Sequence, residues 1–325
     1  KQTLAELQAI GTNSTTAAYS YGLGASIDAS VTGEWNSNSG FVPIAEFSGN
    51  LTGNANAVSN LKINRSGTNN IGIFENITGA NSNVENVSFT NINIRGKYNV
   101  GSIAGLIEDG ASLTVNDVAV NGSVAGVDGG DSSLGGLVGR MGGAQNGGSF
   151  PDSSILIQRS SFDGEIEVYD DDGSSGDIYA GGMIGKFPFT LGTVVIKNSS
   201  VTGTGFTIYD SYSSAGDRVG LIIGRGQNQD FVNVQDFYAN IGNFRDDKGL
   251  IDGSGSLGGN VVIKRGYISI ESADVTASDD EGALSEQIYQ LESNPIKSTN
   301  YDVLTSDQLT GANASDNLGT DFNPF

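Results

Sequence analysis

The sequence contains no cysteine and no histidine among its 325 residues. The first absence excludes disulfide bonds and thiolate metal sites. The second removes the commonest general base and the commonest transition-metal ligand, and with them the Ser–His–Asp and Cys–His mechanisms of catalysis. Carboxylate chemistry remains open to an enzyme built from this chain.

Proline and long apolar runs are also scarce. Five prolines exclude a collagen-like or proline-rich chain. No apolar run approaches the roughly 18 residues of a membrane span, so we expect no membrane insertion. Hydrophobic residues make up 37% of the chain in short, evenly distributed runs, which favours a folded protein with a thin core. The start, KQTLAELQAI, is not a signal peptide, and we expect a mature segment of a longer protein.

Positive charge is scarce as well, because the chain has only 16 Lys and Arg residues against 37 Asp and Glu residues, which gives a net charge of −21. Such a surface repels nucleic acid and anionic membranes, and we expect no nucleic-acid partner. It suits calcium, which prefers carboxylate and carbonyl oxygens, and calcium is the one cofactor that we expect. An acidic surface poor in lysine also fits a saline habitat.

Glycine is abundant, with 48 residues, and it marks an internal repeat. NVGSIAGLI begins at Asn99, SLGGLVGRM at Ser133, YAGGMIGKF at Tyr179 and RVGLIIGRG at Arg218, and a shorter relative, NIGIFENI, begins at Asn70. The first glycines of these motifs are 29, 34, 46 and 39 residues apart. A phosphate-binding loop would need a strand-to-helix context and Gly-Lys-Ser/Thr, which are missing. We therefore expect the glycines to permit tight corners and close approach of neighbouring segments.

Segments with apolar residues two positions apart recur between the glycine motifs, for example at 83–96, 113–126 and 194–208. This is the periodicity of strands, and Asn, Asp, Gly and Ser mark the corners between them. Helical periodicity is nearly absent from 45–278. The pattern predicts an all-β fold, a right-handed parallel β-helix (solenoid), with the handedness taken from the general preference of parallel crossovers. A propeller is the alternative, but it requires more regular spacing and tight hairpin turns.

The ends of such a solenoid need covering, because terminal strands expose unpaired backbone. We expect one cooperative domain with an N-terminal cap at 1–44, β-helix repeats at 45–278 and a C-terminal cap at 279–325, both caps being short helical or irregular segments. TLAELQAI predicts a short helix with Thr3 as its N-cap and Glu6 three residues later. Residues 279–292 predict a second helix with acidic residues at its start.

A series of anchors resembles the GLUG-repeat regions of filamentous-haemagglutinin-type and related large bacterial surface adhesins. The anchors are Tyr21 and Leu23, Ile27 and Asp28, Trp35, Phe41 to Ile44, Phe47 and Gly49, Leu61 and Ile63, the GGLVG segment at 135–139, and the tail LTSDQL…LGTDFNPF. The sequence departs from the pattern at LTGNANA, which lacks the usual histidine. The resemblance implies an extended β-helical surface protein, commonly adhesive, and it brings no catalytic residues.

Two sets of candidate site residues follow from acidic loops and nearby tyrosines. The calcium candidates are Asp170, Asp171, Asp172 and Asp177, with weaker groups at 128–131 and 279–281. The candidates for stacking on sugar rings are Tyr169, Tyr179, Tyr209 and Tyr212. The competing interpretations are a solvated acidic loop and tyrosines packed in turns.

The predicted function is that of a non-enzymatic adhesin segment, secreted or on the cell surface, acting as a rigid stalk or as a binding module for surface or glycan attachment. Its expected partners are a host or surface glycan or protein, or neighbouring adhesin modules. One alternative is a polysaccharide-degrading β-helix that uses a carboxylate pair such as Asp163 with Glu165 or Asp210 with Asp217. Another is a self-assembling filament or matrix subunit.

Overall fold

The computed structural model describes residues 1–127, 132–142, 152–170, 177–187, 192–210, 218–226, 231–243, 261–270 and 301–303. In these residues the chain is almost entirely β-strand, arranged in three sheets, with few and short helices. Every pairing between its named strands is parallel. The prediction of an all-β chain with parallel strands is confirmed.

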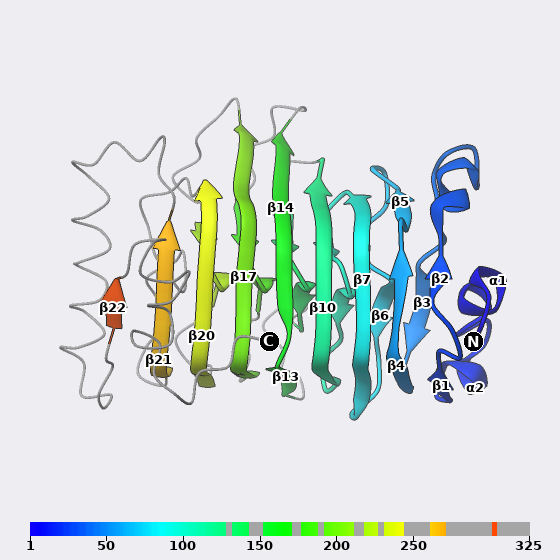
Figure 1. Cartoon of the computed structure of the whole chain (residues 1–325), viewed down its shortest axis with the longest axis horizontal. Helices are drawn as coiled ribbons and strands as arrows, with labels where there is room; N and C mark the ends of the chain where they lie inside the picture. Colours follow the sequence, from blue (N-terminus) through cyan, green and yellow to red (C-terminus); the bar gives the residue numbers. More distant parts are fainter. Residues whose placement is uncertain are drawn as a thin grey trace.

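The largest sheet, called here the long sheet, has twelve strands and runs the length of the molecule (Figure 1). Along its path lie β1 (Ser20–Gly22), β4 (Asn50–Ser59), β7 (Ser82–Gly96), β10 (Ser112–Gly126), β13 (Ser153–Gln158), β17 (Gly192–Asp210), β20 (Phe231–Asn243), β21 (Val261–Ile270) and β22 (Tyr301–Val303). Three further strands pair beside this path, namely β2 (Ile27–Asp28), β5 (Lys62–Asn64) and β14 (Ser161–Asp170).

Two smaller sheets complete each passage of the chain. The second sheet holds β8 (Asn99–Gly101), β11 (Ser132–Gly135), β15 (Ile178–Gly181) and β18 (Arg218–Gly220). The third holds β3 (Ile44–Phe47), β6 (Phe74–Ile77), β9 (Ala104–Ile107), β12 (Val138–Met141), β16 (Ile184–Lys186) and β19 (Ile223–Arg225). The chain runs from the long sheet to the second, then the third, and back, for example through β7, β8, β9 and β10. We call one such passage a coil. This connectivity is consistent with the predicted parallel β-helix.

The glycine repeat of the sequence corresponds to columns in the structure. Gly101, Gly135, Gly181 and Gly220 pair in register across the second sheet. A Cβ on Gly139 would lie 2.4 Å from the backbone nitrogen of Val100 in the preceding coil, and one on Gly185 would lie 2.5 Å from the carbonyl oxygen of Gly139. The expected close approach of neighbouring segments is therefore confirmed, and it needs no unusual backbone angle at these two positions.

Apolar side chains from all three sheets fill the interior in stacked columns. Ile155, Val194 and Val232 pair in register in successive coils, and each is at most 2% exposed. The rings of Phe47 and Phe74 stack with their centroids 4.1 Å apart. Each such side chain contributes about 1.5–3 kcal/mol when fully buried. Because every coil supplies buried side chains of this kind, the hydrophobic stabilisation is distributed along the stack rather than concentrated at one point.

A column of left-handed residues divides the long sheet. It consists of Asn86, Asp117, Arg159, Asn198 and Asp236, whose φ angles lie between 48° and 53°. In β10, Asn116 and Asp117 both point outward, while Val115 before them and Val118 after them are buried. The column therefore separates a first face, formed by the beginnings of the strands, from a second face, formed by their later halves.

The N-terminal end begins with α1 (Leu4–Gln8), α2 (Ser14–Ala17) and the 3-10 helix η1 (Ser30–Glu34). Thr3 caps α1 and exchanges hydrogen bonds with Glu6, which confirms the predicted helix and its cap. The side chain of Gln8 donates to the carbonyl of Val42 at 2.8 Å and accepts from its N–H at 2.9 Å, so it pairs both backbone groups of the segment that leads into β3. Parallel pairing already begins at β1, within the segment expected to form the cap.

The other end of the chain is described only at β22. The helix expected at 279–292 lies outside the described residues, as does most of the predicted cap at 279–325. Across the residues that the structure does describe, none of the helices combines the length and apolar character needed to cross a membrane.

Candidate functional site

A ladder of side-chain hydrogen bonds links successive coils on the outer surface. Asn60 donates to Asp28 at 3.0 Å, and Asn91 donates to Asn60 at 2.7 Å. Further along, the Asn121 side chain donates to one carboxylate oxygen of Asp163 at 2.9 Å. The hydrogen bond from Asn60, followed by that from the Ser30 backbone, lowers the pKa of Asp28. The hydrogen bond from Asn60 therefore favours the ionised form of Asp28, and the ladder ties neighbouring coils together.

Asp163 belongs to the carboxylate pair considered for polysaccharide cleavage. Its second carboxylate oxygen accepts from the Thr202 hydroxyl at 3.0 Å. One oxygen of Asp163 thus accepts from a side chain of the preceding coil and the other from a side chain of the following coil. Linking these coils is sufficient to explain an acidic residue at this position. The other pair considered, Asp210 with Asp217, lies outside the described side chains.

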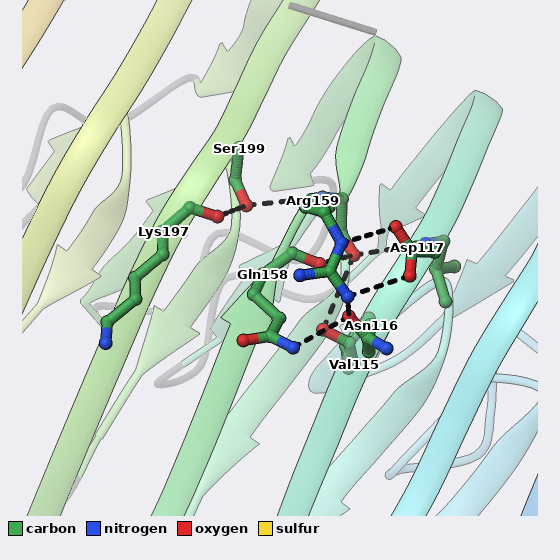
Figure 2. Close-up of polar contacts among 9 residues, drawn as sticks. Val115, Asn116, Asp117, Gln158, Arg159, Lys197 and Ser199 are labelled. Carbon is green, nitrogen blue, oxygen red and sulfur yellow. Dashed lines mark hydrogen bonds and ion pairs between the residues drawn. The ribbon is translucent and has the colours of Figure 1, made fainter. Parts of the chain in front are cut away.

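The corner column carries a cluster of polar contacts around Arg159 (Figure 2). The Arg159 guanidinium binds both carboxylate oxygens of Asp117, through Nε at 2.7 Å and Nη2 at 2.9 Å. This interaction raises the pKa of Arg159. Gln158 donates to Asn116 at 2.8 Å, so the two residues before the corner also bridge the coils. About half of the Arg159 and Asp117 side chains is exposed, and such a surface pair stabilises weakly, by about 0–1 kcal/mol.

Two buried serines lie directly behind this corner. The Ser160 hydroxyl donates to the carbonyl of Gln158 at 2.8 Å and accepts from the N–H of Val118 at 3.1 Å. The Ser199 hydroxyl donates to the carbonyl of Lys197 at 2.8 Å. Both hydroxyls therefore satisfy backbone groups of the corner, and this accounts for polar side chains in the interior.

The predicted calcium residues are only partly described. Asp171, Asp172 and the weaker groups at 128–131 and 279–281 lie outside the described residues, and Asp170 is described as the last backbone position of β14 only. Asp177 accepts a hydrogen bond from the Tyr179 hydroxyl at 2.9 Å. The described residues contain no group of three or more acidic, His or Cys side chains placed to hold a metal ion. Calcium binding stays a prediction.

The predicted sugar-stacking tyrosines have different surroundings. Tyr169 is half-buried, donates to Glu167 at 3.0 Å, and has the Arg95 guanidinium 4.8 Å above its ring. Tyr179 is only 1% exposed, and the Lys186 amine lies 4.1 Å from its ring centroid. Expecting an exposed ring there was wrong, because all four residues of β15 are buried. The Tyr209 side chain and all of Tyr212 lie outside the described residues.

The first face of the long sheet is a surface that the sequence did not single out. Its outward side chains form three rows in register across β10, β13, β17 and β20: Ser112, Ser154, Thr193 and Phe231; Thr114, Leu156, Val195 and Asn233; and Asn116, Gln158, Lys197 and Gln235. These twelve described residues include no carboxylate, and we call them the carboxylate-free face. The nearest acidic residue in the third row is Glu85, on β7.

Together these features define a protein of stacked parallel β-coils, linked on the outside by polar ladders. A family described as the M26 IgA1-specific metallo-endopeptidase N-terminal region matches residues 6–122. Halomucin of Haloquadratum walsbyi (strain DSM 16790 / HBSQ001) is 40% identical over 145 residues, which are 42% of this chain and 2% of that protein. The chain thus matches only a small part of this relative's length.

A crystal structure of a protein provisionally described as an immunoglobulin A1 protease, from Bacteroides ovatus, resembles this fold with a TM-score of 0.52 and 18% sequence identity. The similarity covers 89% of this chain and 77% of that one, and it concerns the fold alone. None of these descriptions refers to GLUG repeats. Zinc peptidase centres use histidine ligands, and this chain has no histidine, so its residues do not fit a centre of that kind.

Proposed function

We propose that this chain is a non-catalytic, rigid segment of a large secreted or cell-surface protein, built as a right-handed parallel β-helix and used for attachment. The observation that carries the proposal is the in-register stack of coils through three parallel sheets. Nine strands along the path of the long sheet give eight spacings, which at about 4.8 Å each make a stack about 38 Å long. Such a stack presents long, fixed outer surfaces to a partner.

The similarities support an extracellular setting. Halomucin and proteins related to IgA1 proteases are consistent with a large surface or secreted protein. The charge of −21 agrees with a segment that stays separate from nucleic acid and anionic membranes. The absence of histidine and the engagement of Asp163 in the ladder favour a structural or binding role over catalysis.

The experiment uses an antibody against this segment on intact producing cells and on their culture medium. We expect the antibody to label unpermeabilised cells or the medium, and we expect a deletion of the segment to reduce cell attachment to coated surfaces. Labelling seen only after permeabilisation would refute the extracellular role. Turnover of IgA1 or of a polysaccharide by the purified chain would refute the non-catalytic role.

A second candidate is a non-catalytic segment that accompanies a peptidase domain within one longer protein. The family match over residues 6–122 favours it. The chain would then hold a protein substrate for a catalytic centre located elsewhere. Immobilised chain that captures intact IgA1 without cleaving it would support this candidate, and an absence of capture at micromolar IgA1 would remove it.

A further inference from the structure

We propose that the carboxylate-free face binds a polysaccharide chain that bears carboxylate or sulfate groups, laid along its rows of side chains. This inference rests on the attachment role proposed above and names the class of partner and the surface that receives it. It begins from a contrast in charge. The whole chain has 37 acidic against 16 basic residues, yet the twelve residues of this face contribute one lysine and no acid.

The single cation of the face is Lys197. Its neighbours in the row are Gln158 and Gln235, and no described carboxylate lies within ion-pair distance of it. In Figure 2 its side chain extends away from the Arg159–Asp117 pair. The row continues in register to Lys264 on β21. An anionic group on a ligand would therefore meet an ammonium that has no ion-pair partner among the described side chains, flanked by amides that can donate hydrogen bonds.

The other two rows offer contacts for sugar rings. Leu156 and Val195 are adjacent in register and partly buried, and Phe231 is 42% exposed at the end of the first row. Phe231 is one of only four large apolar side chains exposed to this degree among the described residues. Threonine, serine and Asn233 complete these rows with groups that can exchange hydrogen bonds with hydroxyls. The apolar side chains can contact the faces of sugar rings while the neighbouring polar side chains meet the ring hydroxyls.

The size of the face favours an extended polymer over a folded partner. Four strands about 4.8 Å apart and rows spanning about four residues give a surface of about 14 Å by 13 Å, or roughly 200 Å². A stable protein–protein interface needs about 800 Å² on each partner, about four times as much. A chain of sugar units lying across the strands fits the available area. Carboxylates border the third row, because Glu85 on β7 pairs with Asn116, and Asp117 and Asp236 follow Asn116 and Gln235 in the corner column. An anionic group of the polymer is therefore expected beside Lys197 rather than at these borders.

The test is binding of the purified chain to polygalacturonate, dextran sulfate and uncharged dextran, by biolayer interferometry in about 0.15 M salt with a chelator present. The chelator excludes calcium bridges as the source of any signal. We expect saturable binding to at least one acidic polymer, and we expect dextran to bind about tenfold more weakly or not at all. The carboxylated and sulfated polymers distinguish the two anionic groups.

Two pairs of variants locate the site. Lys197→Glu is expected to weaken binding about tenfold, while Lys62→Glu, which makes the same charge change on the second face, is expected to change it less than about twofold. Phe231→Ala should weaken binding severalfold, whereas Tyr19→Ala, at an exposed aromatic residue on β1's side of the molecule, should not. Far-UV circular dichroism and the unfolding midpoint verify that each variant is folded.

Three results would overturn the inference: no saturable binding to either acidic polymer, equal binding of dextran, or equal losses in Lys197→Glu and Lys62→Glu. These results can be distinguished from a failure of the proposed attachment role, because that role is tested by cell labelling and cell attachment and not by polymer binding. A chain that labels intact cells and supports attachment, but binds no acidic polymer through this face, would keep the proposed function and lose only the inference. A chain found only inside cells would remove the proposed function whatever the polymers show.

Discussion

Gly139→Ala tests whether close backbone contact, rather than chain flexibility, explains the repeated glycines. A Cβ at this position would lie 2.4 Å from the nitrogen of Val100, 2.7 Å from the carbonyl carbon of Asn99 and 2.8 Å from the carbonyl oxygen of Gly105. All three atoms are backbone atoms of the preceding coil. Asn99 and Val100 belong to β8, which pairs with β11 and is joined to Ile71 by an isolated bridge, and Gly105 belongs to β9, which pairs with β6 and β12. These backbone atoms therefore cannot rotate away as a flexible side chain could.

The expected loss is the balance of two opposing terms. Overpacking a tight interior costs about 1–3 kcal/mol, and here the clash falls on backbone that must shift in more than one coil. Alanine in place of glycine in a strand gains about 0.5–1 kcal/mol, because the unfolded chain loses freedom. Because the clash involves backbone of more than one strand, we take the upper end of the overpacking cost, about 3 kcal/mol, and subtract about 1 kcal/mol, so Gly139→Ala is expected to lower the free energy of unfolding by about 2 kcal/mol. At about 2 °C for each kcal/mol in a chain of this size, the midpoint should fall by about 4 °C.

Gly33→Ala is the matched control, because a Cβ there would meet nothing within 4 Å and its φ is not positive. It should be neutral or stabilising by up to about 1 kcal/mol. Both variants are compared by urea denaturation followed by circular dichroism and by native-state hydrogen exchange, since stacked coils need not unfold together. If Gly139→Ala were as stable as Gly33→Ala, the close-contact explanation of the glycine columns would be wrong.

Three further changes follow from the same contacts. Gln8→Ala removes two hydrogen bonds to the backbone of Val42, which leads into β3, and should lower the free energy of unfolding by about 1–2 kcal/mol; an unchanged midpoint in urea denaturation would contradict it. Arg159→Asn replaces a bulky residue at φ 48° by one that tolerates this angle and should change stability by less than about 1 kcal/mol despite losing the Asp117 pair; a larger loss in thermal denaturation would show that the pair matters more. Burial, aided by the carboxyls of Glu46 and Asp109, raises the pKa of Glu108, so its ionisation disfavours the folded state at neutral pH. Glu108→Gln should therefore raise the unfolding midpoint at pH 7, and the gain should vanish as pH falls below the ordinary value of 4.5; an equal gain at both pH values would refute the cause.

Features with a local chemical cause were predictable from the sequence. The glycine motifs align in register although their spacing varies from 29 to 46 residues, because insertions lie between strands and leave the paired positions unchanged. The helix at Leu4–Gln8 followed from Thr3 and Glu6, whose side chains interact over three residues. Strand periodicity identified the inward positions of β10 and β17, because the alternation of apolar residues is also a local property of the sequence.

Features set by neighbouring coils were not predictable. The acidic loop next to Tyr179 in the sequence favoured an exposed ring. All four residues of β15 are buried, however, so the alternation of side chains along a strand does not predict which of them face solvent. Arg159 does not resemble the Asn and Asp residues of its column, and its left-handed angle follows only from its register with Asp117. The carboxylate-free face likewise joins residues from four strands that are far apart in sequence. Each depends on pairing that a single sequence does not specify.

The corner column explains how two chemically different surfaces coexist on one sheet. Side chains of a strand alternate between inside and outside, so a change of one position would reverse every later side chain. At the corner, two successive residues, such as Asn116 and Asp117, point outward, and the strand resumes with Val118 inside. The two faces are therefore joined through one left-handed residue per coil, and outward substitutions on either face leave the inward columns unaltered. This separation permits Asp163 and its ladder on one face beside Lys197 and its amide row on the other.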